Sequence, residues 1–224
     1  MAIELKTPKA IIFDWDNTLV NTWPLIHNAL YETFNKYGLT PWSLQETKDN
    51  VGHSLRNSFP VLFGENWERA GADYQAFYQR DHLSKLQILP LSEDVLQYLH
   101  DKGVYLAVVS NKKGHNLRAE AEHIGWAKYF DKLIGSDDAP NDKPHPDPVY
   151  MALEGSGLKA GDEVWFVGDT AVDLECAKNT GCSAVLYGEA VVENLEEGLR
   201  YRGFDVQHFT PDHHSFLALL KQKL

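Results

Sequence analysis

The chain of 224 residues, with 43% hydrophobic and 24% charged residues, is long enough to bury one globular core and to hold a substantial insertion. Its formal net charge of −11 argues against a nucleic-acid partner, because proteins of that class usually present a basic surface to phosphates. A phosphate site in this chain must therefore be a local exception that contains a metal ion or a few well-placed cations.

Cysteine content and hydropathy indicate the compartment. Cys176 and Cys182 are too few for a disulfide scaffold or a four-ligand zinc site, and we expect both to be reduced. Residues 1–9 lack the long apolar segment of a signal peptide, and no later stretch is long and apolar enough to span a bilayer. We therefore expect a cytoplasmic protein without a membrane partner. The sequence does not specify an oligomeric state.

The first predicted strand ends in a cluster of polar residues. Residues 10–13 are apolar and predict a short buried strand, and Asp14, Asp16, Asn17 and Thr18 follow it directly. Side chains two positions apart in an extended chain start toward the same side, so two carboxylates lie close together. Two such anions are costly unless a cation lies between them or one carboxyl holds a proton. A magnesium site beside a phosphoester would satisfy both conditions.

Residues 21–86 predict a block of helices without a convincing strand. Apolar side chains recur at helical spacing over 25–37, and Ser43 and Glu46 have capping-box spacing at the start of a second helix. Residues 66–86 carry an aromatic stripe at helical spacing, which is best explained by packing of one helix on another.

Beyond residue 86 the predicted strands and helices alternate. Further strands are expected at 104–109, 132–135, 163–167, 183–187 and near 204–209, with helices between them, over about 190–202 and after Pro211. This alternation predicts an α/β fold with a doubly wound, mostly parallel, Rossmann-like sheet covered on both faces. The helical block is inserted after the first strand.

Three predicted strands end in polar side chains: Asp14, Ser110 and Asp169. Open α/β sheets bind their ligands beyond the carboxyl ends of the strands. We therefore expect these side chains to meet at one edge of the sheet.

Four clusters along the chain resemble, in order, the motifs of the haloacid dehalogenase superfamily, in particular its phosphoglycolate phosphatase-like members with a helical, C1-type cap. The resemblance covers essentially the whole chain and implies a catalytic core of residues 1–20 and 87–224 with an all-helical cap over 21–86. The clusters are Asp14-Trp15-Asp16-Asn17-Thr18, Ser110-Asn111, Lys143-Pro144-His145-Pro146 and Gly168-Asp169-Thr170-Ala171-Val172-Asp173.

The resemblance implies a role for each matching residue in an aspartyl-phosphate mechanism. Asp14 is expected to be the nucleophile and Asp16 the general acid and base, while Lys143 offsets charge between Asp14 and the phosphoryl group. Thr18 and Ser110 are expected to bind phosphoryl oxygens through their hydroxyls.

The same resemblance implies the rest of the site. Asn111 is expected to bind phosphate through its backbone N–H. The expected cofactor is Mg²⁺, held by Asp14, the carbonyl of Asp16 and Asp169, with Asp173 acting through a water or by steadying the other ligands. Members that act as dehalogenases do not keep an acid at the position of Asp16, so its presence favours phosphoryl chemistry.

The expected substrate is a small soluble phosphoester resembling phosphoglycolate. His53 and Arg56 lie where related caps place a specificity loop and could bind a substrate carboxylate or hydroxyl. The alternative is that they are an ordinary turn histidine and helix-start arginine. Two other functions stay open: a phosphotransferase similar to β-phosphoglucomutase, and a weakly catalytic binding or regulatory protein on the same fold.

Overall fold

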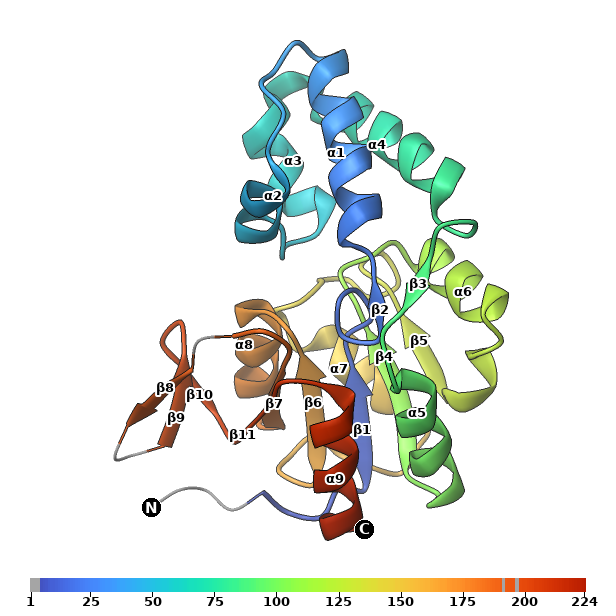
Figure 1. Ribbon diagram of the computed structural model, residues 1–224, viewed down its shortest axis with the longest axis vertical. Coiled ribbons are helices and arrows are strands. Elements are labelled where there is room, and N and C mark those ends of the chain that lie inside the picture. The colour runs from blue at the N-terminus through green and yellow to red at the C-terminus, as the bar shows by residue number, and fades with distance from the viewer. Residues whose placement is uncertain (1–4, 191, 196–197) are drawn as a thin grey trace.

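Six parallel strands form the central sheet of the computed structural model, which describes residues 5–190, 192–195 and 198–224 (Figure 1). The predicted doubly wound α/β fold is confirmed, since every neighbouring pair of these strands runs parallel. In spatial order the strands are β11 (His208–Thr210), β7 (Ser183–Tyr187), β6 (Val164–Gly168), β1 (Ala10–Phe13), β4 (Tyr105–Val109) and β5 (Lys132–Ile134).

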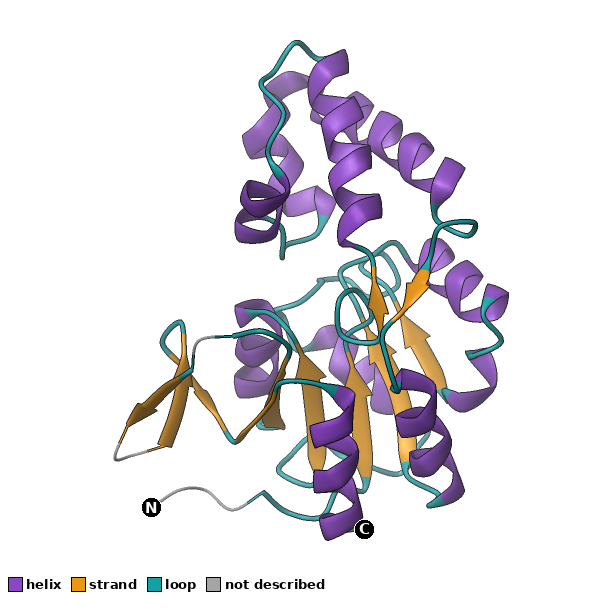
Figure 2. Ribbon diagram, in the orientation of Figure 1, coloured by secondary structure: helices purple, strands orange, loops and turns teal. Residues whose placement is uncertain are grey.

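Helices cover both faces of this sheet (Figure 2). The alternation of side chains along β1 places Ile11 and Phe13 in one hydrophobic cluster and Ala10 and Ile12 in the other, and all four are fully buried. The first cluster includes residues of α5 (Ser92–Asp101), α6 (Gly114–His123) and α9 (His213–Lys223), and the second includes residues of α7 (Asp147–Leu153) and α8 (Ala171–Thr180). The 3₁₀ turn η2 (Ala127–Tyr129) precedes β5.

A helical block lies beyond the carboxyl ends of the strands (Figure 1). It has its own hydrophobic cluster, to which Phe34, Phe59 and Tyr74 belong. A short antiparallel ribbon joins it to the core, and we keep residues 21–86 as its proposed limits. The block contains α1 (Trp23–Lys36), α2 (Leu44–Asn50), α3 (Leu55–Phe63), the turn η1 (Gly64–Asn66) and α4 (Trp67–Asp81), and the ribbon pairs β2 (Val20–Asn21) with β3 (Gln87–Ile88).

Two helix starts show how local sequence fixes this block. The predicted capping box of α2 is confirmed, because the Ser43 hydroxyl accepts from the Glu46 N–H and the Glu46 carboxylate accepts from the Ser43 N–H. At the start of α1, the Asn17 side chain accepts from the N–H groups of Thr22 and Trp23. Asn17 has a left-handed backbone with a φ of 61°, so the loop after β1 turns sharply and anchors the first helix of the block.

The prediction of a helix over about 190–202 is wrong. The described part of this segment forms an antiparallel sheet of β8 (Glu193–Leu195), β9 (Gly198–Tyr201) and β10 (Phe204–Val206); residues 191 and 196–197 lie outside the described residues. Arg202 and Gly203 have φ angles of 49° and 85°, which is the backbone of a two-residue hairpin turn. The predicted strand near 204–209 is divided between β10 and β11.

None of the helices that the structure describes is both long and apolar enough to cross a membrane.

Candidate active site

The register of the sheet brings three strand ends together. Phe13 pairs with Val108 on one side and with Val167 on the other, so the residues that follow β1, β4 and β6 emerge side by side. The Asp14 N–H donates to the Val167 carbonyl at 2.8 Å, which fixes the first residue beyond β1. Asp14, Ser110 and Asp169 line one pocket beneath the helical block, as the strand ends predict.

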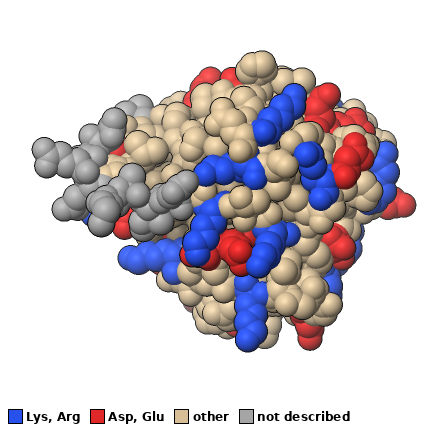
Figure 3. Space-filling view, turned by 90° about the horizontal axis from the view of Figure 1, so that it is seen from below, with Lys and Arg blue, Asp and Glu red and all other residues tan. Residues whose placement is uncertain are grey.

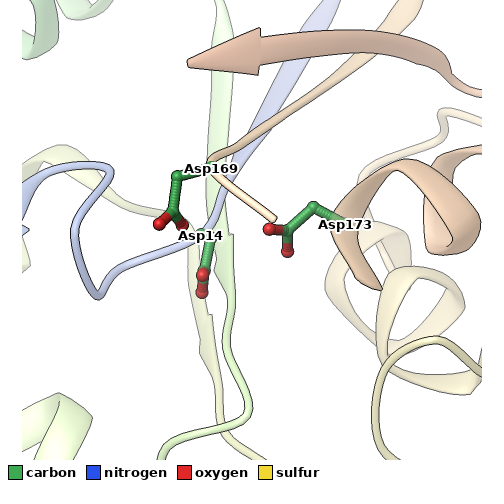
Figure 4. Close-up of side chains that lie close together, drawn as sticks. All are labelled: Asp14, Asp169 and Asp173. Carbon is green, nitrogen blue, oxygen red and sulfur yellow. The ribbon is translucent and has the colours of Figure 1, made fainter. Parts of the chain in front are cut away.

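Three carboxylates converge at this edge of the sheet, and two of them, Asp14 and Asp169, line the pocket (Figure 4). Asp14 follows β1, Asp169 follows β6, and Asp173 comes from the first turn of α8; one oxygen from each lies within 4.8 Å of the others. Gly168, the last residue of β6, permits this approach, because a Cβ at that position would overlap the Asp173 carboxyl group. Carboxylate oxygens are ligands that Mg²⁺ prefers, and one or two of them are enough to hold it together with water and phosphate oxygens.

Both oxygens of Asp173 are engaged by neighbouring groups. One accepts from the Thr170 N–H at 3.0 Å and from the Thr170 hydroxyl at 2.7 Å, which forms the capping box of α8. The other accepts from the Lys143 ammonium at 2.7 Å. Asp173 is therefore well placed to hold Lys143 and the start of α8.

Lys143 bridges two of the acids. Its Nζ lies 2.9 Å from an Asp14 oxygen and 2.7 Å from an Asp173 oxygen, and its side chain is only 2% exposed. Burial opposes the charge of this lysine, but the two carboxylates outweigh burial and hold its pKa above the ordinary value. Lys143 is therefore a permanent cation beside Asp14.

Asp14 and Asp169 are destabilised as carboxylates by their surroundings. Burial raises the pKa of Asp14 to about 6 even though Lys143 acts in the opposite direction. Burial, followed by the charges of Asp173 and Asp14, raises the pKa of Asp169 well above its ordinary value. The Thr18 hydroxyl donates to Asp169 at 3.3 Å, which offers only weak support to that carboxylate. A divalent cation among these oxygens would remove this destabilisation, so the donor set fits a metal ion.

The Asp16 carboxylate is not a member of this cluster. It pairs instead with Lys112, whose Nζ lies 2.7 Å from its Oδ1 and 2.6 Å from Glu120 Oε2. A role of the Asp16 backbone carbonyl as a metal ligand stays a prediction. Lys112 and Glu120 were not among the predicted site residues. A glutamate within the apolar stripe of a predicted helix was the available indication, because Glu120 lies between the buried residues Leu117 and Ala121.

Of the predicted phosphate-binding residues, two line the pocket and the third does not. Ser110 and Asn111 line the pocket, and the Asn111 amide donates to the carbonyls of Gly52 and Lys143 at 3.1 Å each. Asn111 therefore joins the helical block to the Lys143 loop. The Thr18 side chain is fully buried against Asp169, so a contact with phosphate would have to compete with that bond.

The two predicted specificity residues also differ. His53 lines the pocket. Arg56 instead binds Asp142 at 2.9 Å and the Ser136 carbonyl at 2.7 Å, so its guanidinium connects α3 to a loop of the core. A substrate contact by either residue stays a prediction.

The pocket has two kinds of wall. The sheet edge contributes its charged and hydroxyl groups, whereas the helical block contributes apolar and aromatic side chains. The pocket encloses about 740 Å³ of empty space, its mouth included. The apolar side is formed by Trp23, Ile26, Val51, Leu55 and Tyr74.

An α/β sheet with these acids at its strand ends defines a class of hydrolases, and residues 11–187 match the family described as haloacid dehalogenase-like hydrolase. The chain belongs to this family, and the prediction of an enzyme of this superfamily is confirmed. Among solved structures, it is similar to a superfamily hydrolase from Ehrlichia chaffeensis, with a TM-score of 0.67, 26% identity and coverage of 98% of this chain and 99% of that one. A predicted phosphoglycolate phosphatase from Haemophilus somnus has the same fold, with a TM-score of 0.78, 22% identity and coverage of 96% and 99%.

Curated relatives share nearly the full length of the chain. The pyrophosphatase PpaX of Halalkalibacterium halodurans is 29% identical over 204 residues, which are 91% of this chain and 90% of the relative. The phosphoglycolate phosphatase of Neisseria meningitidis is 30% identical over 214 residues, which are 89% of this chain and 90% of the relative.

Proposed function

We propose that the protein is a Mg²⁺-dependent phosphatase that hydrolyses a small soluble phosphate compound in the cytoplasm through an aspartyl-phosphate on Asp14. One observation carries this proposal: Asp14, Asp169 and Asp173 converge within 4.8 Å of one another beside a buried lysine, and Asp14 and Asp169 line a pocket. The names of the curated relatives, which are phosphatases and pyrophosphatases, support the same chemistry.

Asp14 and Asp169 are the side chains best placed to hold Mg²⁺, together with the Asp16 carbonyl. Asp173 contributes by fixing Lys143 and the start of α8, because both of its oxygens already accept hydrogen bonds. When bound, the ion would keep Asp14 ionised and draw negative charge from the phosphoryl oxygens.

In the first half-reaction, an oxygen of Asp14 forms a bond to phosphorus while the bond from phosphorus to the leaving oxygen breaks. Asp16 transfers its proton to that leaving oxygen, so that an alcohol departs rather than an alkoxide. Lys143, 2.9 Å from Asp14, stabilises the negative charge that passes between the carboxylate and the phosphoryl group.

In the second half-reaction, the ionised Asp16 accepts a proton from a water molecule that attacks phosphorus. The bond from phosphorus to Asp14 then breaks, which releases inorganic phosphate and restores both carboxyl groups to their starting states. The helical block covers the pocket and would restrict access of bulk water and of large substrates.

The test is an assay of p-nitrophenyl phosphate hydrolysis by the wild-type protein and by Asp14→Asn, with and without Mg²⁺. We expect activity that requires the ion and falls at least about 10³-fold in the variant, because the nucleophile is lost. Turnover that survives either the substitution or removal of the ion contradicts the mechanism. A binding or regulatory protein would show no turnover with any phosphate compound.

Two substrate types fit the charges of the pocket. Phosphoglycolate and pyrophosphate both carry a second anionic group, and Lys113 lines the pocket 3.6 Å from Asp137, a long ion pair that leaves its charge available to a ligand. Comparing kcat/KM for phosphoglycolate, pyrophosphate and a sugar phosphate distinguishes these candidates. Transfer of phosphate to a sugar rather than to water would instead identify a phosphotransferase.

A further inference from the structure

Five buried polar side chains form a connected group beside the active-site pocket, which we call the Glu120 network: Trp15, Tyr78, His82, Lys112 and Glu120. Each side chain is at most 6% exposed, and Glu120 is completely buried. Tyr78 lies on α4, His82 directly follows α4, and the other three residues belong to the core. The mechanism above assigns no task to any of them.

Glu120 is the centre of this network. Its Oε2 accepts from Trp15 Nε1 at 2.7 Å and from Lys112 Nζ at 2.6 Å. Its Oε1 accepts from the Tyr78 hydroxyl at 2.9 Å and faces His82 Nδ1 at 2.9 Å. A buried carboxylate with partners on both oxygens has a fixed position, so it can hold other groups in place.

Lys112 transmits this fixed position to the active site. Its ammonium contacts Glu120, the Tyr78 hydroxyl at 2.7 Å and the Asp16 carboxylate at 2.7 Å. The contacts with Glu120 and Tyr78 are hydrogen bonds, and the contact with Asp16 is an ion pair, so the ammonium is held from three sides. The lysine therefore has little freedom to turn, and neither does the carboxylate that it binds.

Asp16 needs such a restraint because a second binding site competes for its carboxylate. It lies two residues from Asp14, and the cluster of Asp14, Asp169 and Asp173 would attract any carboxylate oxygen once a divalent cation was bound there. An Asp16 side chain that turned toward the cation could no longer protonate a leaving group.

We propose that Lys112 and Glu120 are positioning residues that hold the Asp16 carboxylate away from the metal site and toward the leaving group, with Tyr78 linking this arrangement to α4. The inference rests on the proposed function, because it assigns a support to the acid of that reaction. A merely structural network between α4 and α6 would also be buried, so the test must detect proton donation itself.

Leaving-group dependence provides that readout. Nitrophenolate departs without a proton, whereas the alkoxide of glycerol phosphate needs one, and kcat/KM reports the steps up to the departure of the leaving group. The variants are Lys112→Met, Glu120→Gln and the double variant, which removes both buried charges together and is the safest for folding. Glu122→Gln is the matched control, because it removes an exposed carboxylate from the same helix.

We expect the double variant to lose roughly 10²-fold in kcat/KM for glycerol phosphate and less than about tenfold for p-nitrophenyl phosphate. Tyr78→Phe should change the ratio of the two values in the same direction by a smaller factor, and Glu122→Gln should leave it unchanged. Equal losses for both substrates, or no loss, in variants that keep the wild-type circular dichroism spectrum overturn the inference. If the wild-type protein hydrolyses neither compound, or if Asp14→Asn stays active, the proposed function fails instead.

Discussion

The two acids of the first motif have different electrostatic partners. Lys143 bridges Asp14 and Asp173, whereas Lys112 bridges Asp16 and Glu120. Each lysine thus neutralises one acid of the first motif and one acid from elsewhere in the chain. In the proposed mechanism, this separation places the nucleophile beside Asp169 and Asp173 and the proton-transfer residue on the side of α6.

Replacing Gly168 tests how closely Asp173 must approach the end of β6. A Cβ in Gly168→Ala would overlap the Asp173 carboxyl group, which must then release Lys143. We expect a loss of about 10- to 100-fold in kcat/KM, because displaced supporting residues of metal sites have effects of that size. Gly161→Ala in the loop before β6 is the control, since a Cβ there meets open space. Equal activity of the two variants would contradict the prediction.

Glu120 should contribute to stability in a defined range of pH. Burial alone would raise its pKa, but Lys112, His82 and Trp15 outweigh burial and lower the pKa to about 2 from its ordinary value of 4.5. Between these values the unfolded chain binds a proton that the folded chain does not, so this stabilisation is complete above pH 4.5 and is lost as the pH falls toward 2.

The measurement is urea unfolding of the wild type and Glu120→Gln between pH 3 and pH 7. We expect the wild type to be more stable at pH 7 by on the order of 2 kcal/mol, and this difference to shrink on acidification. Glu122→Gln serves again as the control. A difference that stays constant with pH would show that Glu120 acts through packing alone.

The sequence predicts the residues at the strand ends better than it predicts their supports. Asp14, Ser110 and Asp169 follow directly from strand boundaries and parallel topology, which are local patterns. Lys112 meets Asp16, and Glu120 meets Trp15, only because α6 packs beside the loop after β1, and sequence spacing does not specify that packing. A long-range ion pair of this kind becomes visible only once the fold is known.

At the scale of elements, two contacts with Asp142 join α3 to the core, and we call them the latch. Arg56 binds Asp142 at 2.9 Å, and the neighbouring Asn57 amide donates to the other oxygen of the same carboxylate at 3.1 Å. Asp142 is 7% exposed, whereas the Arg56 side chain is 42% exposed. The contact is therefore partly screened by solvent, and each member should contribute modestly to the position of the helical block.

A double-mutant cycle of Arg56→Ala and Asp142→Asn distinguishes this latch from a substrate contact. If Arg56 acts as a latch, the two variants should have a coupling energy of about 0.5–1 kcal/mol in unfolding and should change KM alike. If Arg56 binds substrate, Arg56→Ala alone should raise KM. Absence of measurable coupling would exclude the latch.

The elements that the sequence predicts poorly lie in the tail. The alternation from β4 to β7 is confirmed: β4, β6 and β7 are almost entirely buried, β5 is partly buried, and the helices between them place buried side chains against the sheet. Residues 198–206 instead place partly buried Leu199, Tyr201 and Phe204 against the second hydrophobic cluster from a hairpin. Their short apolar spacing fits either a helix or a hairpin, and only the turn at Arg202 and Gly203 decides between them.

For the whole molecule, the question is how a chain of net charge −11 attracts an anionic substrate. The face at the amino ends of the strands carries charges of both signs (Figure 3). Two lysines of that region are paired, Lys6 with Asp162 at 2.6 Å and Lys9 with Glu163 at 2.8 Å. We expect attraction to arise at the opposite edge of the sheet, where a bound cation would add to the charges of Lys143 and Lys113 in the pocket.

Binding of that cation should stabilise the entire fold, because it relieves the repulsion of buried carboxylates that the folded state alone assembles. At a concentration of Mg²⁺ about 100-fold above its Kd, the gain should be about 2.7 kcal/mol, or a rise in Tm of roughly 5–10 °C for a chain of this size. Asp169→Asn should melt at a higher temperature than the wild type without the ion, since it removes one of the repelling charges, and should gain little when the ion is added. Asp162→Asn, on the opposite face, should respond to Mg²⁺ as the wild type does. A wild-type Tm that does not change with Mg²⁺, or an equal rise in Asp169→Asn, would exclude these carboxylates as the metal site, and activity would not enter into that conclusion.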